Sequence, residues 1–406
     1  MTKGINDLQP ARLEQVLNAR RLTKGQLASL VGVSASTVTK WCKGDQSPES
    51  ETFDRLASVL NVQPEWLTRS MLRPISPPLF RSNASALKTA FAKLEARTEW
   101  VQEIALLFSD YVDFPKVNLP ERFFQDPEQI SNAEIEAAAE ECRALWQLGR
   151  SPIQNLVLAA ESAGIVVVRE ETEISAIEGL SSWSSQLERP IVFLSADKAN
   201  GFRSRFDLAH EIGHLILHKQ IPRATERDRY VQMEKQAHRF AGALLLPAES
   251  FANEVRVPTN LDNLLILKQR WGVSVAAIMM RLHALCFLND DEKLALFKRR
   301  SARWGSKAEP GDEKWAPEEP RLLRRTIDLL VGEKVLPVEG IPRHLGFSPR
   351  DVEKLCGLRD NYFAAPAEVV ELATLRTEKT QGKNMHRANE NHTAVVSFQD
   401  FKKRVT

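Results

Sequence analysis

Two histidines four residues apart, inside an almost continuous apolar run, constrain this chain more than any other feature. The segment 206–218 reads Phe-Asp-Leu-Ala-His-Glu-Ile-Gly-His-Leu-Ile-Leu-His, which predicts a helix buried on most of its surface. Residues four apart lie on nearly the same face of a helix, so His210 and His214 can direct their imidazoles at one point. Buried polar groups are costly without a partner. The segment therefore predicts a metal ion shared by the two histidines.

Zinc is the ion that this pattern favours. Catalytic zinc takes three protein ligands and leaves the fourth position to water. Glu211 follows the first histidine directly, so its carboxylate points close to that water. A carboxylate there can take a proton from the water and later pass it to a leaving amine. The motif therefore predicts a zinc-dependent peptidase, and the alternative is an ordinary helix that happens to carry histidines.

The motif alone leaves the third zinc ligand open. A metzincin would need Gly at 217 and His at 220, but the chain has Leu217 and Gln220, which excludes that class. His218 lies two turns beyond the first histidine. Its side chain points in a different direction around the helix, which disfavours binding of one metal ion by all three histidines. The next predicted helix offers Glu234 at the edge of its apolar face, with His238 as the competitor.

The length of the chain, 406 residues, predicts two or three domains. Proline-rich or polar stretches separate the segments that have helical or strand patterns. The expected organisation is, in order, a helical head (1–70), a proline-rich linker (71–83), a helical connector (84–150), an α+β domain (151–290), a second linker (291–320), a helical C-terminal region (321–375) and a flexible polar tail (376–406).

The α+β domain is predicted from a change of pattern near residue 151. Short β-branched or apolar runs predict strands, and longer amphipathic runs predict helices. The strands are expected at 165–168, 177–183 and 191–194, and helices at 153–163, 202–218, 230–246 and 260–287. The fold class is therefore multidomain: an all-α helix-turn-helix head, an α+β domain with a small sheet, and a helical C-terminal region.

The bulk composition points to a cytoplasmic protein. The four cysteines form no Cys-x-x-Cys pair, which disfavours a disulfide framework and a cysteine-based zinc site. No run is long and apolar enough to predict a membrane span, and the first residues lack the apolar core of a signal peptide. The formal net charge is only +2, so local charge matters more than the total.

Residues 24–43 have the pattern of a helix-turn-helix. Gly32 can adopt the positive φ of a turn, and Ser34 is a good N-cap for a second helix. The segment between Glu14 and Asp45 contains no acidic residue, which favours a nucleic-acid face. The residues expected to face double-stranded DNA are Lys24, Ser34, Ala35, Ser36, Thr37, Thr39, Lys40 and Lys43.

Alternatives remain for the helical head. A protein-interaction module would have the same apolar core, although the acid-free basic stretch argues against it. A single head binds DNA weakly, so a homodimer is expected. Residues 341–355 also resemble helix-turn-helix phrasing, which leaves a second DNA contact as a weaker hypothesis.

The blocks around the histidine motif resemble the ImmA/IrrE family of zinc metallopeptidases over roughly residues 140–290. The resemblance includes Leu-Ala-His-Glu-Ile-Gly-His-Leu-Ile-Leu-His and the following helix that ends Leu-Leu-Leu-Pro at 244–247. It implies that Zn²⁺ is held by His210, His214 and Glu234, and that Glu211 is the catalytic base. It also makes Arg205 and Tyr230 candidate substrate contacts, with structural roles as the favoured alternative.

The head in turn resembles the Cro/cI (Xre-like) repressor family over about residues 10–68. Together the resemblances imply a DNA-binding transcriptional regulator whose zinc endopeptidase cleaves a regulatory, repressor-type protein. One alternative is a non-proteolytic transcriptional repressor or antitoxin-like regulator in which the zincin-like domain senses or binds a partner. Another is a peptidase that cuts its own chain in the linker near 71–80.

Overall fold

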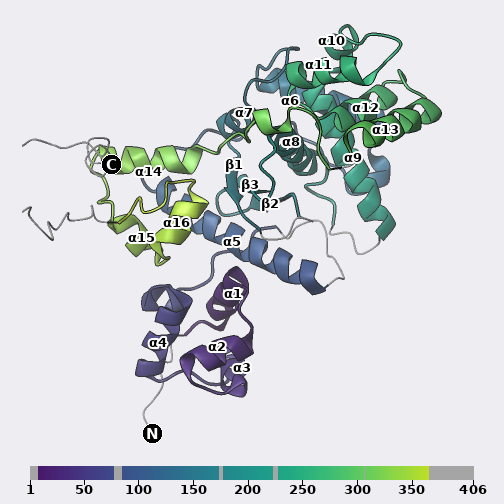
Figure 1. Ribbon diagram of the computed structural model, residues 1–406. Coiled ribbons are helices and arrows are strands. Elements are labelled where there is room, and N and C mark those ends of the chain that lie inside the picture. The colour runs from purple at the N-terminus through teal and green to yellow at the C-terminus, as the bar shows by residue number, and fades with distance from the viewer. Residues whose placement is uncertain (1–7, 77–84, 173–176, 223–226, 306, 365–406) are drawn as a thin grey trace, which may run out of the picture. The chain divides into compact units, whose positions relative to one another are not determined.

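A computed structural model describes residues 8–76, 85–172, 177–222, 227–305 and 307–364 of the chain. In these ranges the head is helical, a mixed three-stranded sheet lies in the middle of the chain, and helices make up the remainder (Figure 1). The multidomain class predicted from the sequence is confirmed. None of the helices in the described ranges is long and apolar enough to cross a membrane.

The head is built from four α-helices and a short 3₁₀ helix. Thr23 caps the second helix in a reciprocal box with Gln26, and Ser34 caps the third through the backbone N–H of Thr37. Gly32 joins the two with φ of +78°, as the sequence predicts. The elements are α1 (Pro10–Arg20), α2 (Lys24–Val31), α3 (Ala35–Lys43), α4 (Ser50–Leu60) and η1 (Pro64–Thr68).

The connector is dominated by α5 (Ser85–Ser109), which contacts both α1 of the head and the central strand of the sheet. After it come η2 (Pro127–Gln129), α6 (Asn132–Leu145) and α7 (Leu156–Ser162). The proline-rich linker predicted over 71–83 has no regular structure at 71–76, and the rest of it lies outside the described residues.

The sheet has strand order β1-β3-β2, with β1 (Val166–Glu170) parallel to β3 (Arg189–Ser195) and β2 (Gly179–Ser184) antiparallel to it. Alternate side chains of a strand point to opposite faces. Val166 and Val168 therefore join the core shared with the head and α5, whereas Val167 joins the core around the later helices. Burial on both faces explains why β1 reads as a continuous β-branched run.

The helices after the sheet cover its second face. The helix α8 (Gly201–Leu217) contacts β2 and β3, and α9 (Arg227–Leu245) packs against α8 (Figure 1). The single helix predicted over 260–287 is two helices, since Gly272 adopts φ of +64° and Ser274 starts the second one. The remaining helices of this part are α10 (Ala248–Ala252), α11 (Leu261–Trp271) and α12 (Val275–Ala284).

The segment 291–320, expected to be a linker, differs from that expectation. Its first half lies in α13 (Asp290–Trp304), which Asn289 starts in a capping box with Glu292. After it, buried Lys268 forms ion pairs with Glu309 and Asp312, the latter in η3 (Asp312–Lys314). Polar residues of this segment, which suggested a linker, therefore form helix caps and buried ion pairs.

The C-terminal region contains α14 (Leu322–Gly332), α15 (Gly340–Leu345) and α16 (Pro349–Leu355), as expected for a helical segment. Residues beyond 364, including the expected tail, lie outside the described residues. The helix-turn-helix phrasing at 341–355 corresponds to α15 and α16, joined at Gly346 with φ of +80°. However, α16 packs against β1, and its Asp351 is buried, so that face is used inside the protein.

A buried charge network joins the head, the connector, the sheet and α16. The guanidinium of Arg97 on α5 donates to Glu170 on β1 at 2.5 and 2.9 Å and to Asp351 at 2.6 Å. Arg20 on α1 donates to the same aspartate at 2.5 and 2.8 Å. Burial would raise the pKa of Asp351, but the hydrogen bond from Arg20 and the charges of the two arginines lower it to about 2.

We expect Asp351→Asn to destabilise the protein by about 3 kcal/mol or more, because removing one member of a buried ion pair leaves its partner's charge poorly compensated. Urea denaturation followed by tryptophan fluorescence measures the change. The control is Glu51→Ala, which breaks an exposed pair with Arg55 and should cost under about 1 kcal/mol.

The folded-state pKa of Asp351 is depressed, so its contribution to stability is present above about pH 4 and is lost as the pH falls towards 2. The difference between wild type and variant should shrink over that range, and a constant difference would contradict the assignment.

Candidate metal centre

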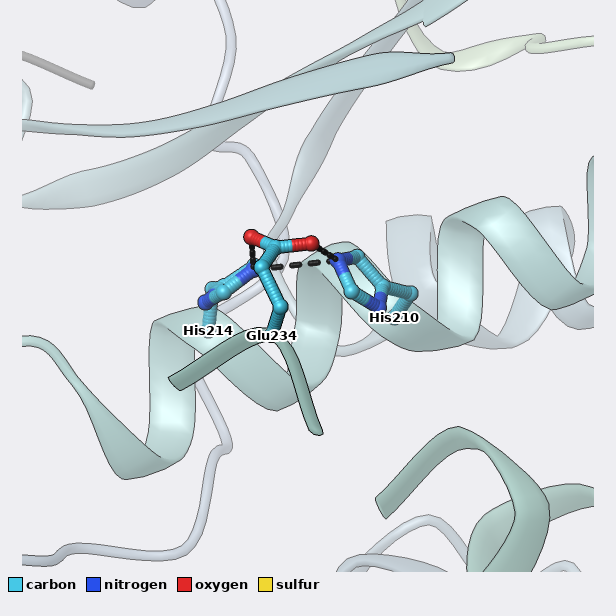
Figure 2. Close-up of side chains that lie close together, drawn as sticks. All are labelled: His210, His214 and Glu234. Atoms are coloured by element: carbon cyan, nitrogen blue, oxygen red, sulfur yellow. Dashed lines mark hydrogen bonds and ion pairs between the residues drawn. The ribbon is translucent and has the colours of Figure 1, made fainter. Parts of the chain in front are cut away.

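Three ligand-type side chains converge between α8 and α9. The Nε2 atoms of His210 and His214 are 3.0 Å apart. The carboxylate of Glu234 lies 3.3 Å from Nε2 of His210 and 3.2 Å from Nε2 of His214, one oxygen to each (Figure 2). Among the described residues this is the group of three or more His, Cys, Asp or Glu side chains whose geometry suits a metal ion.

The spacing of these atoms fits zinc. Zinc binds histidine nitrogen and carboxylate oxygen at about 2.0–2.2 Å in a tetrahedron, whose ligand atoms are therefore about 3.3 Å apart. The three observed separations of 3.0, 3.3 and 3.2 Å are close to that edge length. The donor set of two imidazoles and one carboxylate is also one that zinc accepts, and it leaves a fourth position for water.

Electrostatics favours a cation at this point. Burial would raise the pKa of Glu234, but the neighbouring imidazoles of His210 and His214 hold it well below its usual range. Burial would lower the pKa of His210, yet its hydrogen bond with Glu234 and the charge of Glu211 raise it. The Glu234 carboxylate is therefore ionised in the metal-free chain, and its negative charge favours a cation at this point.

Small residues at the helix crossing bring the ligands together. A Cβ atom at Gly213 would lie 3.1 Å from the ring of Phe240 and 3.3 Å from Cα of Ala237, so α9 approaches α8 closely there. Asn200 starts α8 by capping the N–H of Arg203. The apolar periodicity of α8 then sets its buried face, and the histidine pair follows from that orientation.

Glu211 lies in the same cleft, against the edge strand β2. A Cβ atom at Gly179 would lie 3.0 Å from both Cγ and Oε1 of Glu211, so the absence of a side chain at 179 gives the carboxylate its space. The sequence contains no signal for this contact, because 179 and 211 meet only in the folded sheet. The cleft is lined by Phe91, Ile177, Glu178, Gly179, Leu180, Ser181, Phe206, Asp207, His210, Glu211, His214, Tyr230, Glu234 and His238.

The competing histidines lie beside the cluster and have other partners. His238 donates from Nδ1 to the backbone carbonyl of Glu234 at 2.7 Å, and its ring packs edge-on against His210. His218 is completely buried and contacts the far side of His214. The side chain that sequence reasoning found hardest to assign, Glu234, is the one that joins the two motif histidines.

The two candidate substrate contacts, Arg205 and Tyr230, lie in different environments. Arg205 is buried, donates to the carbonyl of Ile153 and lies 3.4 Å from Glu318, which is a structural environment. Tyr230 lines the cleft, and burial together with the nearby Glu234 raises the pKa of its phenol, so the hydroxyl keeps its proton. Tyr230 is therefore a hydrogen-bond donor next to the cluster.

The residues expected to face DNA lie along α2 and α3 of the head. Ser36, Lys40 and Lys43 are exposed, and Thr37 and Thr39 are partly exposed. The hydroxyl of Ser34 is used as the N-cap of α3, and Lys24 lies 3.4 Å from Glu14. Ser36, Lys40 and Lys43 form one polar, basic side of α3, the second helix of the helix-turn-helix.

Comparison with known proteins identifies two domains. Residues 13–67 match the helix-turn-helix family model, and residues 160–283 match the model of peptidase family M78, the IrrE N-terminal-like domain. An uncharacterized HTH-type transcriptional regulator of Haemophilus influenzae is 21% identical over an alignment of 159 residues that covers 36% of this chain and 64% of that protein. The chain thus matches less than two thirds of this relative.

A transcriptional regulator of Mycobacterium tuberculosis with a solved structure is 17% identical, with a TM-score of 0.26 over 45% of this chain and 52% of that chain. The two family matches cover the head and the α8–α9 region described above. The chain therefore carries an N-terminal Xre-like helix-turn-helix domain and, after it, a domain of the ImmA/IrrE (M78) metallopeptidase family.

Proposed function

We propose that this protein is a DNA-binding transcriptional regulator with a zinc-dependent endopeptidase domain that cleaves a regulatory, repressor-type protein. The observation that carries the peptidase is the convergence of His210, His214 and Glu234 at zinc-ligand spacing, with Glu211 in the same cleft. The M78 match supports the reaction class, and the helix-turn-helix match supports the DNA-binding part.

The residues of the cleft have different roles in the proposed hydrolysis of a peptide bond. His210, His214 and Glu234 hold zinc, which when bound activates a water molecule and polarises the scissile carbonyl. Glu211 takes the proton from the attacking water and passes it to the leaving amine. Tyr230, a protonated phenol that lines the same cleft, donates a hydrogen bond to the carbonyl oxygen as negative charge develops there.

The cleft continues into a larger groove between α9, α12 and α13. Phe206, Tyr230 and His238 line both spaces. Val231 and Met280 are 38% and 53% exposed in the groove, so it presents apolar surface directly beside the cluster. This favours a substrate with a large apolar side chain near the bond that is cut.

Cleavage of the chain's own linker is a second candidate, and one contact favours it. The N–H of Ser76 donates to the carbonyl of Trp183 at 2.9 Å, so the described end of the linker lies beside β2. The opposite end of β2 lines the cleft. Intact mass of the stored protein with zinc and with chelator separates this from cleavage of another protein.

Purified protein should hold about one zinc per chain, measured by inductively coupled plasma mass spectrometry. His214→Ala and Glu234→Gln should each lose most of it, because each removes one of three ligands. His344→Ala is the control, since that histidine is on α15 and bonds the Gly340 carbonyl. A wild-type protein without zinc, with DNA binding intact, would favour the non-proteolytic regulator.

Glu211→Gln should keep zinc but lower cleavage by about 10²-fold or more, because Gln cannot accept the proton from water. Mass spectrometry of new protein N-termini compares cells expressing wild type with cells expressing the variant. Immobilised Glu211→Gln protein should also retain the uncut substrate. Equal cleavage by the variant would exclude the proposed base.

Lys43→Gln should weaken DNA binding about equally for all sequences and reduce the slope of log affinity against log salt by about one, because a phosphate contact is lost. Ser36→Ala should change the preferred sequence, since that side chain is expected to face bases. Selection from random duplexes, followed by titration at several salt concentrations, measures both. Lys298→Gln on α13 is the charge-matched control, and an equal loss there would argue against α3 as the contacting helix.

A further inference from the structure

His218 has no role in the proposed reaction, although it is the most buried histidine beside the cluster. It follows the last residue of α8 and has no solvent exposure. Its Nδ1 lies 2.9 Å from Nδ1 of His214, and its Nε2 lies 3.0 Å from Oε1 of Gln236 on α9. A buried polar side chain with both ring nitrogens engaged forms part of a defined hydrogen-bond network.

The direction of that network follows from its far end. The side-chain nitrogen of Gln236 lies 2.7 Å from the carbonyl oxygen of Pro127 and 3.3 Å from that of Ile130. Carbonyl oxygens only accept hydrogen bonds, so the amide NH₂ must face them. The amide oxygen of Gln236 therefore faces His218 and can only accept.

The orientation of the Gln236 amide then fixes which nitrogen is protonated, first in the ring of His218 and then in that of His214. His218 must donate from Nε2 to the Gln236 oxygen, which leaves a lone pair on its Nδ1 in the neutral ring. That lone pair accepts the proton on Nδ1 of His214. Nε2 of His214, the atom 3.2 Å from Glu234, is therefore the unprotonated nitrogen.

We propose that His218 and Gln236 are positioning residues that hold His214 in the tautomer whose Nε2 lone pair points at the metal centre. The tautomer of His214 follows from the hydrogen-bond geometry alone. Its benefit for metal binding rests on the proposed zinc site. The same geometry assigns His218 a role other than third ligand, because one of its ring nitrogens faces Nδ1 of His214 and the other faces Gln236.

The arrangement distinguishes the two motif histidines. Nδ1 of His210 is buried without a hydrogen-bond partner in the part of the chain that the structure describes, whereas Nδ1 of His214 has one. A hydrogen bond to the outer nitrogen of a ligand histidine fixes its ring orientation and raises its basicity. The usual acceptor is a carboxylate or a carbonyl. Here a neutral imidazole, itself oriented by an amide, takes that place.

The first test reads the tautomers directly in metal-free protein. Long-range ¹H–¹⁵N spectra of histidine-labelled protein near pH 8.5, about two units above the ordinary imidazole pKa, should show His214 protonated at Nδ1 and His218 at Nε2. His218→Phe should release His214 into a mixture of tautomers. A wild-type His214 protonated at Nε2 would overturn the proposal, whether or not the protein binds zinc.

The second test measures zinc affinity by competition with a chromophoric chelator. His218→Phe and Gln236→Leu should each weaken binding by about 10- to 100-fold, the usual effect of losing such a partner. His218→Asn should recover much of the affinity, because its Oδ1 can accept the His214 proton from the Nδ1 position. His238→Phe, which changes a ring beside the cluster that makes no hydrogen bond to a ligand ring, should change affinity by less than about threefold.

The outcomes separate the two proposals. Wild-type protein that binds no zinc contradicts the proposed function, while the tautomer measurement still decides this inference. Wild-type affinity in His218→Phe overturns the positioning role even if the tautomers are as expected. An equal loss in His238→Phe also overturns it, because the effect would then come from packing around the cluster. Melting temperatures of the metal-free variants show whether each is folded.

Discussion

The close packing of α8 against α9 is the contact on which the candidate site depends. Neither helix carries three ligands alone: His210 and His214 come from one and Glu234 from the other. The crossing is close because Gly213 places no side chain between the helices. The same pairing brings Gln236 to His218, so one helix contact supplies both a ligand and the hydrogen-bond network behind another ligand.

Buried charge connects the DNA-binding head to the rest of the described chain. Arg12 of α1 pairs with Glu103 of α5, while Arg97 of α5 pairs with Glu170 and Asp351. Buried ion pairs contribute little net stability compared with apolar packing, because desolvation offsets their attraction. They do penalise any arrangement that separates the partners. The relation of α1 to α5 and of α5 to the sheet is therefore specific, and the head and the peptidase domain share that helix.

Local patterns predicted the parts of the protein that depend on local sequence. The helix around His210, the Gly32 turn and the Ser34 cap all follow from residues within a few positions of each other. Glu234 required the family resemblance, because its place opposite the histidines depends on tertiary packing. The expected linker at 291–320 was wrong in its first half, where α13 begins at a capping box. Polar composition also gave no sign that Glu309 caps α12 through the N–H groups of Val275 and Ala276.

The contact between Gly179 and Glu211 makes the position of the proposed catalytic base depend on a residue outside the His-Glu-x-x-His motif. With alanine at 179, the Glu211 carboxylate would have to give by a few tenths of an ångström. A branched side chain would displace it further, while both histidines and Glu234 stayed in place. A related chain of that kind would keep the proposed zinc ligands and would still match the His-Glu-x-x-His pattern. Whether it hydrolysed peptides would depend on the residue at position 179 on β2. A search that used only the motif on α8 would therefore count an inactive domain as an active one.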